Sequence, residues 1–537
     1  MRAGPHFRNP LLAAVLLLAA GCSTLRTNVV KEPSHALPPA TDTPSAQYVE
    51  SEQAKHDESE SGFRLLTLST NALMSRVALA DHSEHSIDLQ YYIFKNDGTG
   101  RLIAQHLLKA ADRGVRVRIL LDDVGVSDDI GMFDALDAHE NIEVRLFNPF
   151  STKSPGAVSK VAQMLLDWRR LNRRMHNKSF IADNKVAVIG GRNIGDDYFN
   201  ADVDNNYRDL DLLAIGPVVQ EASRSFDSYW NNEAAYPVTA FPTKKNISVD
   251  LAKLRVQLDK EARAFAESDY AQAVLDDLPN GPTADRRGQW FWGMAVTVAD
   301  QPEKVSESSD APSLTIGPKL KTIIDGAQSE VLLISPYFVP SENDEQDLIA
   351  LAKRGVAVKV LTNSLASTDQ PAAHEGYGDH RRDLLAGGIL LFELKPMAAT
   401  KQSATEIGSS SGVSLHAKSF VVDSRYVFVG SMNMDQRSKL LNTEMGVVVD
   451  SPALASAVEK FFATATDPVN SYRVVLESQG GGSGGGSGGD DDKGKGGMHW
   501  QAVENGKNVD YSVEPAASLG KRIEVWLMKL LPIDSLL

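Results

Sequence analysis

Two histidine–lysine pairs, far apart in the chain, have the residue types and spacing best suited to chemistry on a phosphate. His176 is followed by Lys178, and His416 is followed by Lys418. In an extended strand, residues two apart point to the same face, so each imidazole projects beside an ammonium group. An imidazole can attack or transfer a proton near neutral pH, and an ammonium can hold a phosphate oxygen. We therefore expect the pairs to act on a phosphodiester.

The phrase that contains each pair occurs twice in register. The first copy continues with Asp183 and Gly190-Gly191-Arg192-Asn193, and the second continues with Asp423 and Gly430-Ser431-Met432-Asn433. Each matched position of the second copy lies 240 residues after its counterpart (176 to 416, 190 to 430). A single His-x-Lys phrase usually lies on the surface without a catalytic role, but two matched copies indicate a duplicated fold. Each half would then supply half of one active site.

The turns that trail the two pairs supply candidate phosphate-binding residues, namely Gly191, Asn193, Ser431 and Asn433. Their backbone N–H groups and the two side-chain amides could donate to an anion held beside the imidazoles and ammoniums. Such a site could transfer a phosphoryl group mainly through positioning and charge stabilisation. We therefore expect neither a metal nor a cofactor.

The aspartate inside each copy completes the catalytic motif by type, and we group Asp183 and Asp423 with the candidate catalytic residues. Their positions favour a different role. Each lies five residues after its lysine, so strict alternation puts it on the opposite face of the strand. Both sit in turn sequences between apolar runs. A turn-stabilising or supporting role is therefore the preferred interpretation for both.

With these phrases in place, the chain resembles the phospholipase D superfamily, whose signature is H-x-K-x4-D followed by G-[GS]-x-N. The resemblance runs from about Phe63 onward. Within the superfamily, the chain looks most like the bacterial cardiolipin synthases of the C type. The phrases that carry this finer resemblance span residues 88–94, 113–118, 171–180 and 530–534. The first copy carries Gly191 where many members carry serine, which removes one hydroxyl donor.

The resemblance implies a reaction in two displacements through a phosphohistidine. It suggests His176 as nucleophile and His416 as acid and base, although both copies are intact and the sequence leaves the order open. Family members also orient each histidine with a downstream carboxylate. By position, Asp209 fits the first histidine and Glu444 fits the second, and Asp211 is a weaker competitor for the first position. A carboxylate bonded to the far ring nitrogen would fix the tautomer.

Strand and helix patterns recur in the same order in both halves. Strands are predicted over 86–94 and 115–121 around a helix at 102–112, and over 331–339 and 356–362 around a helix at 348–353. This alternation predicts an α/β fold with two pseudo-symmetric sandwich halves packed face to face, and the active site at the seam. We assign the halves to residues 63–236 and 313–478, with a connecting region at 237–312.

The N-terminal residues predict export to the bacterial cell envelope. Arg2 and Arg8 precede an apolar run at 11–20 that is too short to span a bilayer. Residues 1–22 resemble a lipoprotein signal peptide in which Cys22, the only cysteine, becomes lipidated; an ordinary signal peptide is the alternative. We expect a periplasm-facing lipoprotein, with the outer membrane slightly favoured by Ser23. Residues 23–62 are rich in polar residues and proline and predict a disordered tether.

The C-terminal region divides into a linker and a terminal unit. Residues 479–497 form a Gly/Ser linker with an aspartate run, either an engineered insert or an expanded hairpin loop, and are expected to be disordered. Residues 498–537 predict a strand, which could pair with 472–476, and an amphipathic helix near 519–531. That helix could lie at a membrane interface with Trp526 as an anchor, or dock on the enzyme's own core.

The charge balance bears on which phosphodiester is the substrate. The net charge of −15 opposes nucleic-acid binding, because phosphate backbones attract basic surfaces. We expect phospholipid substrates, membrane association and no nucleic-acid partner, and one chain carries both motifs, so no dimer is needed. The predicted activity is phosphatidyl transfer between two phospholipids, and the resemblance implies phosphatidylethanolamine or phosphatidylglycerol as donor and phosphatidylglycerol as acceptor. The alternatives are a hydrolytic phospholipase D and, more weakly, an envelope nuclease or an inactive membrane scaffold. Four arginines before the first histidine could bind lipid phosphate or form a solvated helix face: Arg169, Arg170, Arg173 and Arg174.

Overall fold

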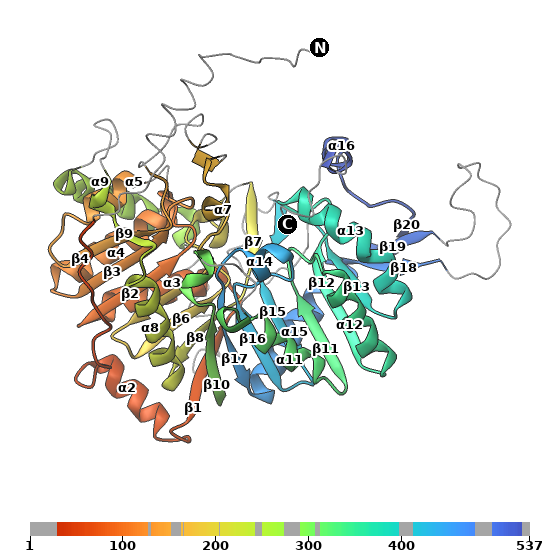
Figure 1. Cartoon of the computed structure of the whole chain (residues 1–537), viewed down its shortest axis with the longest axis horizontal. Helices are drawn as coiled ribbons and strands as arrows, with labels where there is room; N and C mark the ends of the chain where they lie inside the picture. The colour runs from red at the N-terminus through yellow and green to blue at the C-terminus, as the bar shows by residue number, and fades with distance from the viewer. Residues whose placement is uncertain are drawn as a thin grey trace, which may run out of the picture.

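Two α/β halves lie side by side in the computed structural model (Figure 1), and their strands form one continuous sheet of 18 strands. A separate two-stranded sheet joins the halves elsewhere. The structure describes residues 29–126, 130–151, 160, 163–164, 166–202, 204–241, 250–272, 290–306, 312–396, 412–477 and 497–528.

The first half alternates strands and helices. Its strands are β1 (Glu60–Leu66), β2 (Ser86–Tyr91), β3 (Arg116–Asp122), β4 (Ile142–Phe147), β5 (Ser179–Ala182), β6 (Val186–Gly190), β7 (Asn205–Arg208), β8 (Asp211–Ile215) and β9 (Ala235–Pro237). Its helices are α3 (Ser69–His82), α4 (Gly98–Asp112), α5 (Ile130–Leu136), α7 (Trp168–Leu171), α8 (Pro217–Trp230) and α9 (Leu251–Ala266).

The second half repeats this order and adds a C-terminal unit. Its strands are β10 (Phe291–Ala299), β11 (Glu330–Ile334), β12 (Ala357–Asn363), β13 (Leu390–Leu394), β14 (Gly412–Leu415), β15 (Lys418–Val422), β16 (Tyr426–Gly430), β17 (Met445–Asp450), β18 (Ser471–Leu476), β19 (Met498–Glu504) and β20 (Lys507–Tyr511). Its helices are α11 (Gly317–Asp325), α12 (Glu342–Lys353), α13 (Pro371–Ala386), α14 (Gln436–Leu440), α15 (Pro452–Ala465) and α16 (Leu519–Met528).

The order of hydrogen-bonded strands reveals the duplication. The first half runs β9-β4-β3-β2-β5-β6-β8-β1 from its edge strand, and the matching strands of the second half run β18-β13-β12-β11-β15-β16-β17-β10. The two series meet where β1 pairs with β10, with Phe63 opposite Phe291. Equivalent strands therefore lie at equal distances from this joint, which gives the molecule a pseudo-twofold axis.

The halves also share a hydrophobic core. Ile189 and Leu212 of the first half belong to the same buried cluster as Val429 and Val447 of the second. Two further clusters fill the outer layers of the individual halves. The sheet is therefore continuous through the β1–β10 joint, and the shared core packs the halves face to face, which confirms the predicted fold class.

The connecting region differs from its predicted boundaries. Residues 237–312 include β10, which pairs with β17 on one side and with β1 on the other. β10 occupies in the second half the place of β1 in the first. The second half therefore begins near residue 290, and not at 313, because its first strand is needed to complete the sheet.

The segment predicted as a disordered tether is ordered from residue 29 onward, which corrects that prediction. Ser34 and Ala36 donate backbone hydrogen bonds to the side chains of Asn231 and Asp227 at 3.1 and 2.8 Å. A helix, α2 (Pro44–Gln53), then packs Val49 into a small apolar cluster of the first half. Backbone hydrogen bonds to the folded half offset the ordering cost that the polar composition alone would leave uncompensated.

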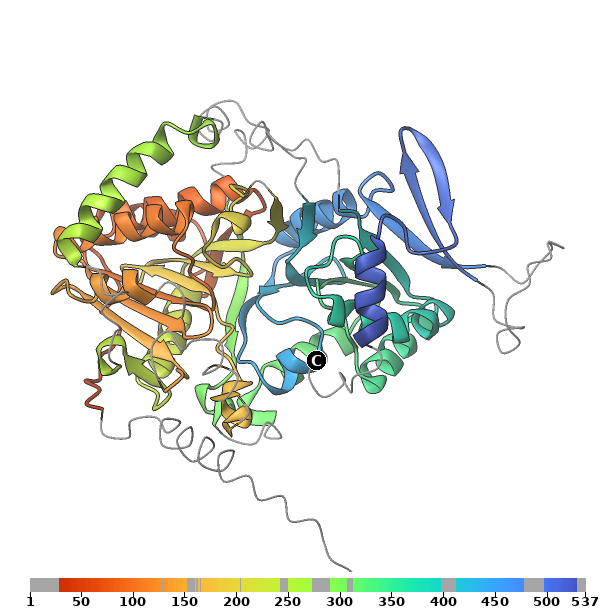
Figure 2. The same cartoon turned by 90° about the horizontal axis from the view of Figure 1, so that it is seen from above.

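The C-terminal unit confirms the predicted strand pairing and adds a second strand. β19 pairs with β18, with Trp500 opposite Val474, and β20 extends the sheet beyond it. The helix α16 lies over α13 (Figures 1 and 2). The predicted signal peptide with Cys22 and the Gly/Ser linker lie outside the described residues, apart from Gly497 at the linker's last position.

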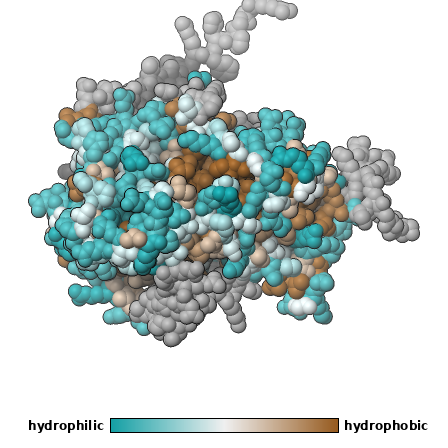
Figure 3. All heavy atoms as spheres, turned by 90° about the horizontal axis from the view of Figure 1, so that it is seen from below, coloured by the Kyte–Doolittle hydropathy of each residue, from teal (hydrophilic) through white to brown (hydrophobic). Residues whose placement is uncertain are grey.

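The face seen from below is hydrophilic over most of its area (Figure 3). Seen from below, apolar residues gather near the middle of the molecule between hydrophilic margins (Figure 3). Within the part of the chain that the structure describes, no helix has both the length and the apolar character needed to cross a membrane.

Candidate active site

The two motif histidines lie at the seam, and each is held by a carboxylate from the opposite half. His176 Nδ1 lies 2.9 Å from Glu444 Oε2, and His416 Nδ1 lies 2.5 Å from Asp209 Oδ2. All four side chains are buried. With Nδ1 bonded to a carboxylate, Nε2 is the ring nitrogen left for the substrate in both rings. The site is therefore complete only when both halves are present.

This crossed pairing corrects the predicted partners. The sequence distances suggested that Asp209 serves His176 and that Glu444 serves His416, within each half. The backbone shows why the partners exchange. His176 donates its N–H to Thr443 O at 2.9 Å, and His416 donates its N–H to Arg208 O at 2.7 Å. Each histidine thus hydrogen-bonds to the residue that precedes the other half's carboxylate.

Pairing between β7 and β14 stabilises one of these crossings. The two strands run parallel, with Tyr207 opposite Ser414 and Arg208 opposite Leu415, immediately before Asp209 and His416. On the other side, Met175 forms an isolated bridge with Thr443. Short strands from different halves therefore bring together histidines and carboxylates that are far apart in the chain.

The two carboxylates have different supports. Glu444 accepts a hydrogen bond from the Ser431 hydroxyl, and its own N–H donates to Asp300 Oδ2 at 3.0 Å. Asp209 instead accepts from Leu210 N–H at 2.7 Å and has no serine beside it. A Cβ atom at Gly191 would stand 2.2 Å from Asp209 Oδ1. The glycine in the first motif is therefore required by the carboxylate that lies against it.

These contacts correct the predicted phosphate-donor role of Gly191 and Ser431. Their backbone N–H groups donate to Leu210 O at 3.1 Å and to Met445 O at 2.8 Å, so the neighbouring strands already use them. Asn193 accepts a hydrogen bond from Ile93 N–H at 3.2 Å. Asn433 Oδ1 is buried and has no partner among the described residues. Phosphate binding by the two asparagines stays a prediction.

The motif lysines lie inside the same site. Lys178 donates to His176 O at 2.6 Å, and Lys418 donates to His416 O. Burial lowers the pKa of Lys418 to about 8 and lowers the pKa of Lys178 well below its usual value. A bound phosphate would supply the negative charge that these buried ammonium groups need.

The ionisation of the histidines follows from burial and from the lysines. Burial, followed by the nearby positive charges, lowers the pKa of His176 well below 6.5 and that of His416 to about 4. Burial raises the pKa of Glu444 to about 7. Burial would also raise the pKa of Asp209, but the charge and hydrogen bond of His416 outweigh it and lower that pKa. Burial therefore favours neutral imidazoles while no anion is bound, and the charge of a bound phosphate would favour protonation of one ring.

Aromatic rings surround the histidines, and sequence reasoning missed them as site residues. Tyr92 lies 5.1 Å from the His176 ring, and Tyr198 and Tyr207 lie 5.2 and 5.1 Å from the His416 ring. Tyr207 stands two residues before Asp209, which was the available signal. These rings exclude water from the sides of the imidazoles.

A third carboxylate, Asp369, lies in the same region of the site. Asp369 accepts hydrogen bonds from Tyr207 OH at 3.1 Å and from Tyr337 OH at 2.9 Å. The Lys418 ammonium lies 5.9 Å from the Tyr337 ring. Asp369 is therefore held next to the catalytic groups by two tyrosines, and it had no motif in the sequence to identify it.

The motif aspartates lie in the turns. Asp183 accepts hydrogen bonds from the backbone N–H groups of residues 84–86, and Asp423 accepts from those of residues 328–330. Both have left-handed backbone, with φ of 52° and 53°. They therefore join each hairpin turn to the loop before β2 or β11, which corrects their grouping with the catalytic residues and agrees with the turn-stabilising interpretation.

The arginine cluster is mostly committed to internal contacts. Arg174 is buried and pairs with Asp122 at 2.8 Å, Arg173 donates to Lys304 O at 2.7 Å, and Arg170 bonds to Asp167. Only Arg169 of the four is exposed. Asp211, the weaker candidate for orienting a histidine, pairs with Arg76 and Arg192 and contacts neither imidazole.

The polar groups of the site are imidazoles, ammonium groups and carboxylates, and each histidine is paired with a carboxylate. Within the described residues, no group of three or more His, Cys, Asp or Glu side chains is arranged to hold a metal ion. The site's own groups can supply a nucleophile, a proton carrier and two cations for a phosphate.

Comparisons with known proteins agree with this geometry. The family described as cardiolipin synthase, PLD-like domain, matches residues 77–230 and 320–465. Cardiolipin synthase C of Escherichia coli K12 is 36% identical over 480 residues, which cover 88% of this chain and 95% of the relative. A cardiolipin synthase of Clostridium perfringens SM101 is 28% identical over 71% of this chain and 65% of its own length.

Among solved structures, phosphatidylserine synthase of Haemophilus influenzae Rd KW20 superposes with a TM-score of 0.51 at 14% identity. The match covers 79% of this chain and 92% of that structure. This likeness bears on the fold alone. The two matched family segments coincide with the two halves that meet at the histidine pairs. The chain belongs to the phospholipase D superfamily, in its bacterial cardiolipin synthase branch of the C type.

Proposed function

We propose that this protein makes cardiolipin by transferring a phosphatidyl group to phosphatidylglycerol through a phosphohistidine. Membership of the cardiolipin synthase branch makes the chain a phosphatidyltransferase. The observation that carries the proposal is the crossed pair of histidine–carboxylate contacts beside two buried lysines. The donor is phosphatidylethanolamine or a second phosphatidylglycerol, each of which releases a head-group alcohol.

In the first step, Nε2 of one histidine attacks the donor phosphorus and the bond from phosphorus to the head-group oxygen breaks. The other histidine enters the step as an imidazolium, protonated once the anionic phosphate is bound, and gives its Nε2 proton to the leaving oxygen. Lys178 and Lys418 hold the non-bridging oxygens and reduce the charge that builds up on them. The product of this step is a phosphatidyl-histidine and a free alcohol.

In the second step, a glycerol hydroxyl of phosphatidylglycerol attacks the same phosphorus. The acid–base histidine takes the hydroxyl proton, the phosphorus–nitrogen bond breaks, and cardiolipin leaves. Water could take the place of the hydroxyl, and the product would then be phosphatidic acid. The tyrosine rings packed around the imidazoles favour transfer by limiting the room for water.

The charges support His176 as nucleophile and His416 as acid and base. Asp209 has a lowered pKa, so it is ionised and can stabilise an imidazolium on His416. Burial raises the pKa of Glu444 to about 7, so this partner stabilises a positive charge on His176 less well. A histidine that stays neutral keeps its lone pair for attack.

We also propose that α16 rests on the membrane beside the loop that carries Asp369. Its large apolar residues point outward, with Leu519, Ile523 and Trp526 exposed by 73%, 49% and 60%. Lys521 fixes the helix from its other side by donating to Ala366 O and Thr368 O, in the loop that carries Asp369. An exposed apolar face with a tryptophan suits a lipid interface. Lipidation of Cys22 in the bacterial cell envelope, facing the periplasm, is the matching proposal for localisation.

The test uses the full chain with vesicles of phosphatidylethanolamine and head-group-labelled phosphatidylglycerol. We expect cardiolipin from the wild-type protein and none from His176→Ala or His416→Ala. His82→Ala, at an exposed histidine of α3, is the matched control and should retain full activity. Accumulation of phosphatidic acid without cardiolipin would identify a hydrolase instead. Cardiolipin formation that survives both histidine substitutions would refute the proposed site.

The order of the two histidines can be tested in the same system. With no acceptor present and a donor labelled on its phosphorus, a His416→Ala protein should accumulate label on His176 when the leaving alcohol is activated and needs no proton. Mass spectrometry of acid-protected peptides would locate the label. Label on His416 in a His176→Ala protein would reverse the assignment.

A further inference from the structure

The second half contains a pocket of about 480 Å³ behind its motif turn. The pocket lies between the helices α11 and α12 and the strands β15 and β16. Its lining is largely apolar and includes Leu320, Leu333, Leu348, Leu351, Phe420 and Phe428. The two phenylalanine rings stack with centroids 5.3 Å apart. This volume falls within the range of about 300–1,000 Å³ that small-molecule sites occupy.

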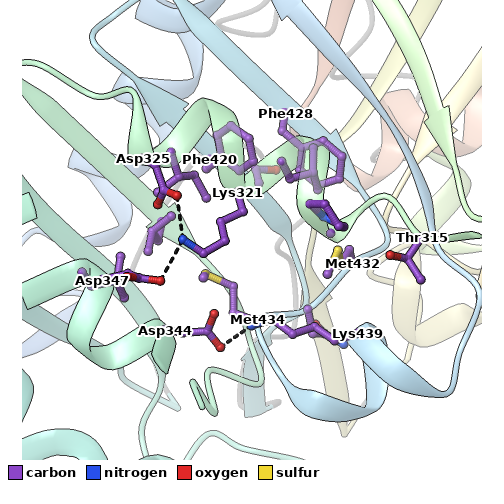
Figure 4. A pocket seen from close by; sticks show the side chains of 18 of the residues that line it. Thr315, Lys321, Asp325, Asp344, Asp347, Phe420, Phe428, Met432, Met434 and Lys439 are labelled. Atoms are coloured by element: carbon purple, nitrogen blue, oxygen red, sulfur yellow. Dashed lines mark hydrogen bonds and ion pairs between the residues drawn. The ribbon is translucent and has the colours of Figure 1, made fainter. Parts of the chain in front are cut away.

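The charged residues of the pocket stand at its rim. Lys321 pairs with Asp325 at 2.6 Å and with Asp347 at 2.7 Å, and all three side chains are exposed by about 45%. Lys439 pairs with Asp344 at another part of the rim (Figure 4). The interior is therefore apolar while its charged margin meets solvent.

The pocket is lined by residues that lie next to the second motif's catalytic groups in the chain. Ser419 and Phe420, which line it, directly follow Lys418 in β15. Asn433 and Met432 of the motif turn also line it. Asn433 Oδ1 is buried without a partner among the described residues, so a polar acceptor remains open beside the apolar cavity.

The equivalent place in the first half is filled. Arg192 occupies the position that matches Met432, and its buried guanidinium bonds to Asp211, Leu66 O and Thr67 O. Arg76 joins Asp211 from α3 at 3.0 Å. In the second half, the strand position that matches Asp211 is Gly446, because Gly190 pairs with Asp211 and Gly430 pairs with Gly446. The pocket is thus a property of one half and not of the repeated scaffold.

We propose that this pocket holds one acyl chain of a phospholipid substrate whose phosphate lies between the two lysines. The inference rests on the proposed function, and it adds a chain-binding subsite to that reaction. The polar ester end would lie at Asn433, whose side-chain NH₂ group can donate to the ester carbonyl, and the chain would run between α11 and α12. Each methylene that leaves water there strengthens binding by about fourfold.

Blocking the pocket should therefore change the dependence of the rate on acyl length. Leu320→Trp and Leu348→Trp fill it from opposite walls without touching the catalytic groups. With phosphatidylglycerol in mixed micelles, we expect kcat/KM to fall at least about tenfold for 16- and 18-carbon chains. For six-carbon chains the fall should be less than about twofold. Val256→Trp, on an exposed residue of α9, adds the same ring elsewhere and should change neither rate.

A measurement on the unmodified protein guards against variants that fail to fold. Phosphatidylglycerol with a photoreactive diazirine at the end of one acyl chain should cross-link to α11, α12 or residues 432–434. Leu320→Trp should move or abolish those cross-links. Cross-links confined to other elements, such as α16, would overturn the proposal.

The outcomes separate this inference from the proposed function. Cardiolipin synthesis with equal losses for long and short chains in both variants would overturn the pocket and leave the function standing. Absence of phosphatidyl transfer with either chain length would overturn the function. In that event, cross-links at 432–434 would still establish the pocket as a lipid site.

Discussion

The two halves share one scaffold, and they differ most behind the motif turn that follows the second hairpin strand. In the first half, buried Arg192, Arg76 and Asp211 fill that place with ion pairs. In the second half, Met432 and Gly446 leave an apolar pocket. The carboxylates differ as well, because Asp209 lies against Gly191 and Glu444 lies against Ser431. Duplication preserved the histidines and lysines while the surrounding contacts diverged.

This difference teaches that pseudo-symmetry in the motif does not imply equal roles. A buried network of charges makes one half rigid around its turn. The other half keeps room next to its catalytic lysine. Because each histidine hydrogen-bonds to the carboxylate of the opposite half, its surroundings include contacts from both halves.

The largest expected effect tests the two carboxylates against each other. Asp209→Asn should lower kcat for cardiolipin formation by about 10⁴-fold, because an amide cannot stabilise the imidazolium of His416. Glu444→Gln should lower kcat by a smaller factor, since a carboxyl with a pKa of about 7 is already partly protonated at neutral pH. Steady-state rates of both purified proteins would check this. A larger loss in Glu444→Gln would reverse the assignment of acid and nucleophile.

The next effect concerns stability. Arg192→Met gives the first half the residue of the second and leaves Asp211 with one fewer cation in a buried site. We expect the free energy of unfolding to fall by about 3–5 kcal/mol in a urea titration. Met432→Leu, the matched change in the second half, should cost under about 1.5 kcal/mol. Equal costs would show that the two environments are energetically alike.

A smaller effect is expected at the motif turns. Gly191→Ser forces a Cβ into Asp209 and should lower kcat by about 10²-fold through displacement of that carboxylate. Ser431→Gly removes a hydroxyl donor from Glu444 without a clash and should lower kcat by about tenfold. Both rates would be measured with long-chain phosphatidylglycerol. A Gly191→Ser protein with full activity would contradict the steric account of that glycine.

The smallest effect is a dependence of stability on pH. Burial lowers the folded-state pKa of His416 to about 4, whereas its pKa in the unfolded chain is about 6.5. Between these two pH values the unfolded chain binds a proton on this residue and the folded protein does not. Stability from this group is therefore complete above about pH 6.5 and falls by about 1.4 kcal/mol per unit as pH drops towards 4. Urea unfolding between pH 4.5 and 6.5 should show a shallower slope in His416→Gln. An unchanged slope would mean that this histidine is already charged in the folded protein.

Much of the catalytic chemistry could be predicted from the residues alone. The repeated His-x-Lys phrases predicted one site at a seam. The alternation of side chains along a strand predicted that Asp183 and Asp423 stabilise the turns in which they lie. Asp209 and Glu444 were found as candidates, but with their partners exchanged. Chain distance favours partners within a half, whereas the backbone hydrogen bonds of Thr443 and Arg208 cross between halves.

Other features could not be read locally. Residues 29–62 have the composition of a tether and are ordered because α8 and β3 offer partners, including Arg118, which donates to Ser34 O. β10 lacked a recognisable role until it met β1 at the joint. Asp369 belongs to no motif and reaches the site only through Tyr207 and Tyr337.

The sequence by itself determined the identity of the reacting groups, their duplication and the family to which the chain belongs. These depend on residue type and on spacing within single strands, which are local properties. Only the tertiary structure decided which carboxylate serves which histidine, which half contains the pocket, and why one motif carries glycine. Those depend on contacts between residues more than 200 positions apart or on the volume left between packed elements. Side-chain packing decides these features, and the residue pattern of a single strand does not encode that packing.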